Sequence, residues 1–209
     1  MSKISSSESY VIWEEIIGKA RLEDGREPLF RGYFAATIFA FENLRQGLSA
    51  KLARELAGSG LEESALKKII AESEHNERLV SDAAADIKAT LDRDSACNSP
   101  LEVFLFYKGF AALQAHRLAN HLWLKGQKLL ALLIQSHVSN CFGIDIHPAA
   151  KIGRGIMLDH ATGLVIGETA IVGDAVSIMQ SVTLGGTGKE SGDRHPKIGC
   201  GVLIGPGAK

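Results

Sequence analysis

The pair Asp159-His160 contains the residue types that most clearly suggest chemistry. An imidazole titrates near neutral pH and can take a proton from a hydroxyl group, which is a poor nucleophile while it is protonated. A carboxylate on the second ring nitrogen would fix the tautomer and stabilise the imidazolium. Asp145 lies upstream and could supply this carboxylate, because the chain between it and His160 is irregular. The spacing alone fits a solvated turn histidine equally well.

A second polar group is Arg194-His195, inside a polar insertion between Leu184 and Ile198. A guanidinium can hold a carboxylate through two parallel hydrogen bonds. Loops that project from a rigid scaffold are common binding sites. The pair therefore indicates a site for a ligand that carries a carboxylate, and the alternative is a flexible charged loop.

The glycine-rich segment Gly185-Gly-Thr-Gly-Lys189 does not fit a phosphate-binding loop. A P-loop needs another glycine five residues before its last glycine, and Ser or Thr after the lysine. Thr183 and Glu190 occupy these positions. We interpret the segment as a bend at which glycine lets the chain of a ligand approach the backbone, and Lys189 as a solvated loop residue.

The element that must position these residues is indicated by aliphatic side chains that recur every six positions after Ile144. They are Ile146, Ile152 and Leu158, then Ile166, Val172, Ile178 and Leu184, then Ile198 and Ile204. A period of six fits neither a helix nor an alternating strand. It is typical of a coil of short flat faces, each with one aliphatic side chain inward, in which three faces make a turn of about 18 residues. The His and Asp residues above fall where such a coil turns side chains outward.

The first part of the chain has helical spacing instead. Helices are expected over Val11–Ala20 after a Ser-rich start that can cap it, from Pro28, over Leu48–Leu56, from Leu66, over Leu79–Leu91, from Pro100 to Gly126, and over Lys128–Val138. We therefore expect an α + β chain with a helical domain at 1–140 and a coil domain at 141–209.

Composition excludes several classes of protein. The formal net charge of −1 over 209 residues gives no reason to expect binding to nucleic acid or to an anionic membrane. The three cysteines have no zinc-site or disulfide-framework spacing, so we expect reduced thiols and no metal. Neither a signal peptide nor an apolar run of membrane-spanning length is present, which favours a cytoplasmic location.

Together these segments resemble the bacterial serine O-acetyltransferase family. The resemblance is carried by Asp145–Gly163, Val165–Ala170, Gln180–Lys189, Gly192–Ile198, Asp92-Arg-Asp94 and Tyr107–Arg117, and it covers essentially the whole chain. It implies a helical domain followed by a left-handed parallel β-helix, in trimers that often pair as hexamers through the helical domains. It also implies acetyl transfer from acetyl-CoA to the hydroxyl of L-serine, with inhibition by L-cysteine in the serine site and no permanently bound cofactor.

The resemblance also implies roles for particular residues. His160 would be the general base and Asp145 its orienting partner. Asp94 and Asp159 would lie near the substrate ammonium, Arg194 would hold the carboxylate, and His195 and Glu168 would support the site, which lies between adjacent subunits. The pantetheine arm of acetyl-CoA would lie along Gly185, Gly186, Thr187, Gly205 and Ala208.

The chain ends at Lys209, just before the next expected inward position, so we expect a truncated form or a partner over this end. Members of the family normally complete the β-helix and add a tail that docks into O-acetylserine sulfhydrylase. This chain lacks that tail, so the docking is not carried over to it, and complete acetyl-CoA binding is left open.

Two other functions fit a β-helix. Trimeric β-helices also hold carbonic anhydrase sites, in which three histidines bind zinc across a subunit boundary. Besides His160 and His195, the coil has only His147, which lies too early. The other alternative is a binding or scaffold protein that forms trimers without catalysis.

Overall fold

The computed structural model describes residues 2–58, 61–71, 76–189 and 191–209. They form two compact units, Met1–Phe106 and Tyr107–Lys209. No helix in these ranges combines the length and the apolar character needed to cross a bilayer.

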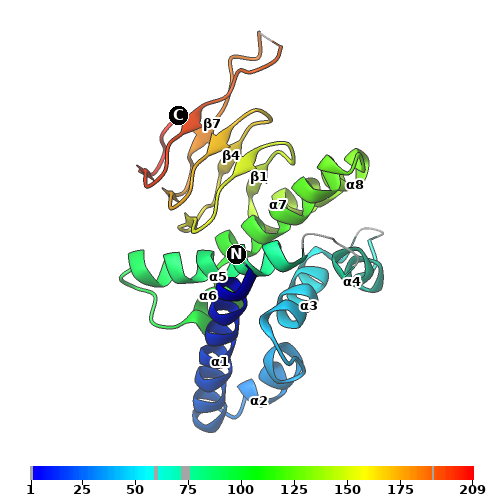
Figure 1. Ribbon diagram of the computed structural model, residues 1–209, viewed down its shortest axis with the longest axis vertical. Helices are drawn as coiled ribbons and strands as arrows, with labels where there is room; N and C mark the ends of the chain where they lie inside the picture. Colours follow the sequence, from blue (N-terminus) through cyan, green and yellow to red (C-terminus); the bar gives the residue numbers. More distant parts are fainter. Residues whose placement is uncertain (1, 59–60, 72–75, 190) are drawn as a thin grey trace. The chain divides into compact units, whose positions relative to one another are not determined.

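The first unit is helical (Figure 1). Its elements are α1 (Ser2–Arg26), α2 (Phe30–Phe34), the π-helix η1 (Ala35–Phe39), α3 (Leu44–Leu56), α4 (Glu63–Ala71), α5 (Asn76–Arg93) and α6 (Pro100–Phe106). Trp13 and Phe104 meet edge to face at 5.6 Å between ring centroids, inside its core. The side chain of Asn43 caps α3 by accepting a hydrogen bond of 3.1 Å from the Gln46 N–H.

Several expected helix boundaries were wrong. The Ser-rich start lies inside α1, which begins at Ser2. The helix expected from Pro28 begins at Phe30 and widens into η1 at Ala35. The long helix expected after Pro100 is two helices, because Tyr107 takes an extended conformation (φ −84°, ψ 102°) between them.

The second unit begins with α7 (Lys108–Leu124) and α8 (Lys128–Phe142). Gly126 and Gly143 end these two helices with φ of +81° and +66°, a left-handed conformation that glycine adopts without strain. The strands follow as β1 (Ile144–Ile146), β2 (Lys151–Ile152), β3 (Met157–Leu158), β4 (Leu164–Ile166), β5 (Ile171–Val172), β6 (Ser177–Ile178), β7 (Thr183–Leu184), β8 (Lys197–Ile198) and β9 (Leu203–Ile204).

These strands form three parallel sheets, which are the faces of a β-helix. The sheets have the orders β1-β4-β7, β2-β5-β8 and β3-β6-β9, and the first of them is visible as a stack in Figure 1. The register places the residues of the six-residue pattern directly over one another: Ile146, Ile166 and Leu184 on one face, Ile152, Val172 and Ile198 on the next, and Leu158, Ile178 and Ile204 on the third. The expected coil is therefore confirmed residue by residue.

Helices α7 and α8 belong to the same compact unit as the coil. From α7, Arg117 Nη2 donates to the Gly153 carbonyl at 2.8 Å, and Asn120 Nδ2 donates to the Pro148 carbonyl at 2.7 Å. The expected boundary near residue 140 therefore lies close to the change from helix to strand, whereas the compact unit starts at Tyr107. The difference arises because these two helices pack on the first turn of the coil.

Candidate active site

The first group of candidate residues lies where the chain leaves β3. His160 and the next residue, Ala161, both have left-handed backbone conformations, with φ of 53° and 58°. Its imidazole is 75% exposed, and Nε2 lies 3.8 Å from Oδ1 of Asp159, whose side chain is 21% exposed. This separation allows electrostatic attraction but is too long for a hydrogen bond. The imidazole is therefore open to a substrate, with one carboxylate beside it.

Helix α7 packs against the corner that carries His160. A Cβ on Gly109 would lie 2.1 Å from the Leu158 carbonyl oxygen, so only glycine allows the helix to approach the end of β3 this closely. Lys108 Nζ donates to Oγ1 of Thr162 on the other side of the corner. The Asp159 N–H donates to the Ile178 carbonyl at 2.9 Å, which ties the corner to the next turn of the coil.

The second group of candidate residues lies where the insertion between β7 and β8 folds back on the turn after β4. Figure 1 shows this insertion extending away from the stacked strands. Arg194 Nη2 donates to Glu168 Oε2 at 3.0 Å. The Thr169 hydroxyl oxygen accepts from the backbone N–H of both Arg194 and His195, each at 3.1 Å. These contacts fix the Arg194-His195 pair on the coil, so it is not the flexible charged loop of the alternative interpretation.

The tautomer of His195 follows from its hydrogen bonds. The Thr169 backbone N–H donates to its Nδ1 at 3.2 Å, so Nδ1 is the unprotonated nitrogen of a neutral ring. The proton is then on Nε2, which can act as a donor. A Cβ on Gly167 would lie 2.0 Å from this ring, so the absence of a side chain there makes room for the imidazole.

Asp145 is placed with the second group and not with His160. Its Oδ1 accepts a hydrogen bond of 2.6 Å from Gln135 Nε2 of α8. It also acts electrostatically on His147. Burial lowers the pKa of His147, and the negative charges of Glu168 and Asp145 oppose this effect.

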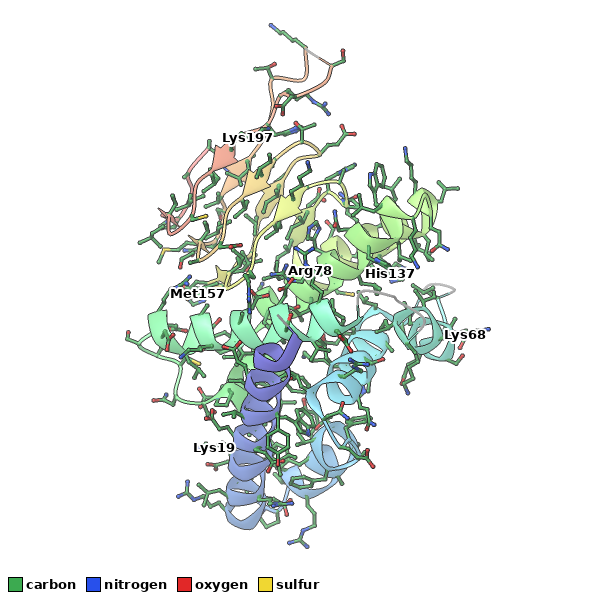
Figure 2. All side chains as sticks on the ribbon, in the orientation of Figure 1. Lys19, Lys68, Arg78, His137, Met157 and Lys197 are labelled. Atoms are coloured by element: carbon green, nitrogen blue, oxygen red, sulfur yellow. The ribbon has the colours of Figure 1, made fainter. Side chains whose placement is uncertain are left out.

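Within the described part of one chain, Asp145 makes no hydrogen bond or ion pair with His160. The physical reason is that Asp145 lies on the flat face of β1, whereas His160 lies at the corner that leaves β3. Figure 2 labels Met157 and Lys197, each two residues from one group, and they lie at separate parts of the coil. One chain therefore carries the candidate residues as two separate groups.

Asp94 belongs to the first compact unit, where it follows α5. Its Oδ1 accepts a hydrogen bond of 2.9 Å from the Ala96 N–H. This contact organises the turn that leads toward α6.

The residues expected to bind acetyl-CoA lie at the last turn of the coil. The Thr183 N–H donates to the Ala208 carbonyl at 2.8 Å, which holds the end of β7 beside the turn that contains Gly205 and Ala208. A Cβ on Gly205 would meet nothing within 4 Å, so its outer side is open. A Cβ on Gly186 would lie 2.9 Å from the Arg194 carbonyl oxygen, so this glycine allows the insertion to fold back. Thr187, in the same insertion, lies on the exposed surface.

Two supporting residues were missed from the sequence. Thr169 binds both members of the Arg194-His195 pair, and Gln135 binds Asp145. Neither residue type indicates a functional role in the sequence. Both form hydrogen bonds with residues that are distant in the sequence, and only the fold shows which residues these are. Among the described residues, no three His, Cys, Asp or Glu side chains converge as metal ligands.

Comparison with known proteins agrees with this fold and identifies a family. The family model described as serine acetyltransferase, N-terminal, matches residues 12–115. A serine acetyltransferase of Salmonella typhimurium is 50% identical over 200 residues, which cover 95% of this chain and 73% of the relative.

Solved structures agree as well. A soybean serine acetyltransferase complexed with serine has a TM-score of 0.92 at 47% identity, over 96% of this chain and 83% of that one. A serine acetyltransferase in complex with cysteine has a TM-score of 0.91 at 46% identity, over 94% of this chain and 82% of that one. The chain is an acyltransferase built on a left-handed parallel β-helix. Among such enzymes, it belongs to the serine acetyltransferase family.

Proposed function

We propose that the protein transfers the acetyl group of acetyl-CoA to the hydroxyl of L-serine, with His160 as the general base. The products are O-acetyl-L-serine and CoA. The observation that carries this proposal is the exposed His160 imidazole, held at a rigid corner with Asp159 beside it and with no hydrogen bond within the described chain that would occupy it. The serine complex of the soybean relative supports L-serine as the acceptor.

In the proposed reaction, the His160 imidazole takes the serine hydroxyl proton while the oxygen attacks the thioester carbonyl. A new C–O bond forms, and the C–S bond breaks as the tetrahedral intermediate collapses. The imidazolium returns the proton to the CoA sulfur, so the enzyme ends the cycle unchanged. A carboxylate on the other ring nitrogen stabilises the imidazolium during this cycle.

The two charged ends of serine match the charged groups of the chain. Arg194 would grip the carboxylate, and its present partner Glu168 keeps the guanidinium in place. Asp94 and Asp159 would attract the ammonium. The Nε2–H of His195 would donate a hydrogen bond to the bound amino acid. L-Cysteine differs from serine only by sulfur in place of the hydroxyl oxygen, so it would compete for the same site, as the cysteine complex of a relative suggests.

We infer that a complete site forms between neighbouring subunits of a trimer. The His160 corner of one subunit would face the Arg194-His195 group of the next, and the Asp145 that orients His160 would come from that second subunit. This arrangement accounts for two half-sites on one coil. In a cyclic trimer the interface is heterologous, so one surface of each chain meets a different surface of the next identical chain. Pairing of two trimers through the helical units remains part of the proposal.

Acetyl-CoA would lie along the outer side of the last coil turn. Gly185, Gly186 and Thr187 on one side, and Gly205 and Ala208 on the other, leave backbone groups accessible to the pantetheine arm. In this position the thioester would approach His160 of one subunit and the serine site together.

The test is His160→Ala, assayed by the thiol released from acetyl-CoA with and without L-serine. We expect serine-dependent release to fall by about 10²–10⁴-fold, the usual contribution of a general base. The fold of each chain should not change, because the side chain is exposed in the single chain and lies outside its core, and the oligomeric state is measured alongside. Lys151→Ala, at an exposed position on β2, is the matched control and should keep its activity. Activity within a few-fold of the unmodified protein would place the base elsewhere.

A further inference from the structure

The insertion between β7 and β8 ends at a lysine that has no part in the proposed reaction. This residue, Lys197, is labelled in Figure 2 and is the first residue of β8. Lys197 pairs with Ile171 of β5, which pairs with Lys151 of β2, so the three side chains form one ladder on the outer side of the coil. An outward lysine is ordinarily a solvated residue, so its role depends on what it contacts.

The Lys197 ammonium is fully hydrogen-bonded within the described part of the chain. Its Nζ donates to the Thr169 carbonyl at 2.7 Å and to the His195 carbonyl at 2.8 Å. It also donates to Oδ1 of Asp193. An ammonium has three N–H donors, so these three acceptors use all of them. The hydrogen bond from Lys197 lowers the pKa of the Asp193 carboxyl, which favours its charged form.

These contacts join the two segments that carry the proposed carboxylate-binding group. Thr169 belongs to the turn that follows β4. Asp193 and His195 are the two neighbours of Arg194 in the insertion. Lys197 therefore ties the residues on both sides of Arg194 to this turn, while the Thr169 hydroxyl oxygen accepts from the Arg194 backbone N–H at 3.1 Å.

We propose that Lys197 is a positioning residue for the amino-acid substrate, and that it acts by holding Arg194 in place before serine binds. The inference rests on the proposed function, in which Arg194 holds the serine carboxylate. A loop that becomes ordered only on binding weakens the affinity, because the ordering costs free energy. Lys197 orders the end of the insertion in the free protein. All three of its donors are used, so it acts on binding through Arg194 and not by contact with the substrate.

The kinetic test is Lys197→Met, which keeps an unbranched side chain of similar length but has no donor. The KM for L-serine should rise by about tenfold or more, because charge-assisted hydrogen bonds that organise the site are lost. L-Cysteine should inhibit more weakly by a similar factor. The kcat at saturating serine should stay within about threefold, as expected when only binding is affected.

Lys151→Met is the matched control, since Lys151 lies in the same ladder on β2. It should leave the KM for serine and the inhibition by cysteine unchanged. A fall in kcat with an unchanged KM for serine in Lys197→Met would overturn the proposal, and so would equal effects of the two substitutions.

A further variant separates anchoring from simple charge attraction. If Lys197 acted only through its positive charge, removal of the neighbouring negative charge of Asp193 would strengthen the attraction for the serine carboxylate and lower KM. If Lys197 is an anchor, Asp193→Ala removes one of its three contacts, and KM should rise by roughly a few-fold. A lower KM in Asp193→Ala would contradict the anchoring role.

Hydrogen exchange of the whole protein tests the anchor without substrate. The backbone N–H groups of Arg194 and His195 donate to the Thr169 hydroxyl, so they should exchange slowly in the unmodified protein. In Lys197→Met the peptide that contains them should exchange at least about tenfold faster. Gly173, whose N–H is hydrogen-bonded inside the coil at 2.9 Å, should stay protected in both proteins.

The two measurements separate failure of this inference from failure of the proposed function. Unchanged exchange in Lys197→Met would overturn the anchor, whatever the activity. Faster exchange with unchanged serine kinetics would overturn the positioning role. Absence of serine-dependent thiol release in the unmodified protein would instead contradict the proposed function, and the exchange would still show whether Lys197 holds the insertion.

Discussion

His160 and His195 differ in how the chain holds them, and this difference fits the separate tasks proposed for them. The Thr169 N–H fixes His195 as a neutral ring whose remaining nitrogen is a donor. His160 has no such partner within the described chain, and its imidazole is open to solvent. A locked donor suits the orientation of a substrate, whereas an unoccupied imidazole suits proton transfer.

A third histidine, His116 of α7, should affect the pH dependence of stability. Burial lowers the pKa of His116 to about 3, and a hydrogen bond to the Ala150 backbone only partly opposes this. The unfolded chain therefore binds a proton below about pH 6.5 that the folded chain does not bind. Stability is lost as the pH falls through this window, by about 2 kcal/mol between pH 7 and pH 5 from this residue alone.

His116→Gln cannot titrate and should remove that part of the pH dependence. The measurement is urea denaturation at pH 7 and pH 5 at a fixed protein concentration. Leu113→Met, a conservative change at a buried position of the same helix that does not titrate, is the control and should leave the pH dependence as it is. If His116→Gln loses as much stability between the two pH values as the unmodified protein, the buried ring is not the titrating group.

At the scale of elements, α7 acts as the base on which the coil is built. It binds the first turn of the coil through Arg117 and Asn120, and it meets the end of β3 through Gly109. The last of these contacts is made by backbone against backbone, so it cannot be relieved by rotation of a side chain. The position of the His160 corner therefore depends on the surface of this helix.

Gly109→Ala should lower both stability and turnover. The new methyl group would meet the Leu158 carbonyl oxygen at 2.1 Å, and relief of this contact must move β3 or the helix. Overpacking of this kind costs about 1–3 kcal/mol, measurable by thermal denaturation.

Gly18→Ala is the matched control, since nothing lies within 4 Å of a Cβ at this position of α1. It should be neutral or stabilising by up to about 1 kcal/mol. Equal effects of the two substitutions would mean that the approach of α7 to β3 is unimportant.

The sequence predicts the coil well, because the aliphatic residues that reveal the six-residue period are also the residues that point into the core of the coil. Each ladder stacks the aliphatic residues of the pattern over one another. Helix ends were predicted less well. The extended Tyr107 and the widening at Ala35 depend on packing between elements, which no local pattern encodes.

The candidate residues of the proposed site are predicted from residue type and from the family motif, but their distribution over the coil is not. Asp145 and His160 lie on different parts of the coil because strand and corner positions follow from the register. The supporting hydrogen bonds of Thr169 and Gln135 become apparent only from the three-dimensional structure.

At the scale of the whole molecule, the two separate groups lead to a test by mixed trimers. His160→Ala and Arg194→Ala should each be nearly inactive alone, because each damages one half of every site. In trimers formed from an equal mixture, one interface of each mixed trimer would join two intact halves. Activity should then return to about one quarter of that of the unmodified protein.

The two variants can be co-expressed with different tags and purified through both, which enriches the mixed trimers, or unfolded and refolded together. The control is separate refolding of each variant followed by mixing. A site built within a single chain would give no recovery in either preparation.

The left-handed conformation of His160 also constrains how the protein can become more heat-resistant. A residue with a side chain pays a conformational penalty at φ of 53°, of order 1–3 kcal/mol, which glycine would largely avoid. Selection for thermal tolerance alone would therefore favour glycine at this corner and remove the proposed base. A histidine at this corner, in place of glycine, is what selection for turnover at some cost in stability would give.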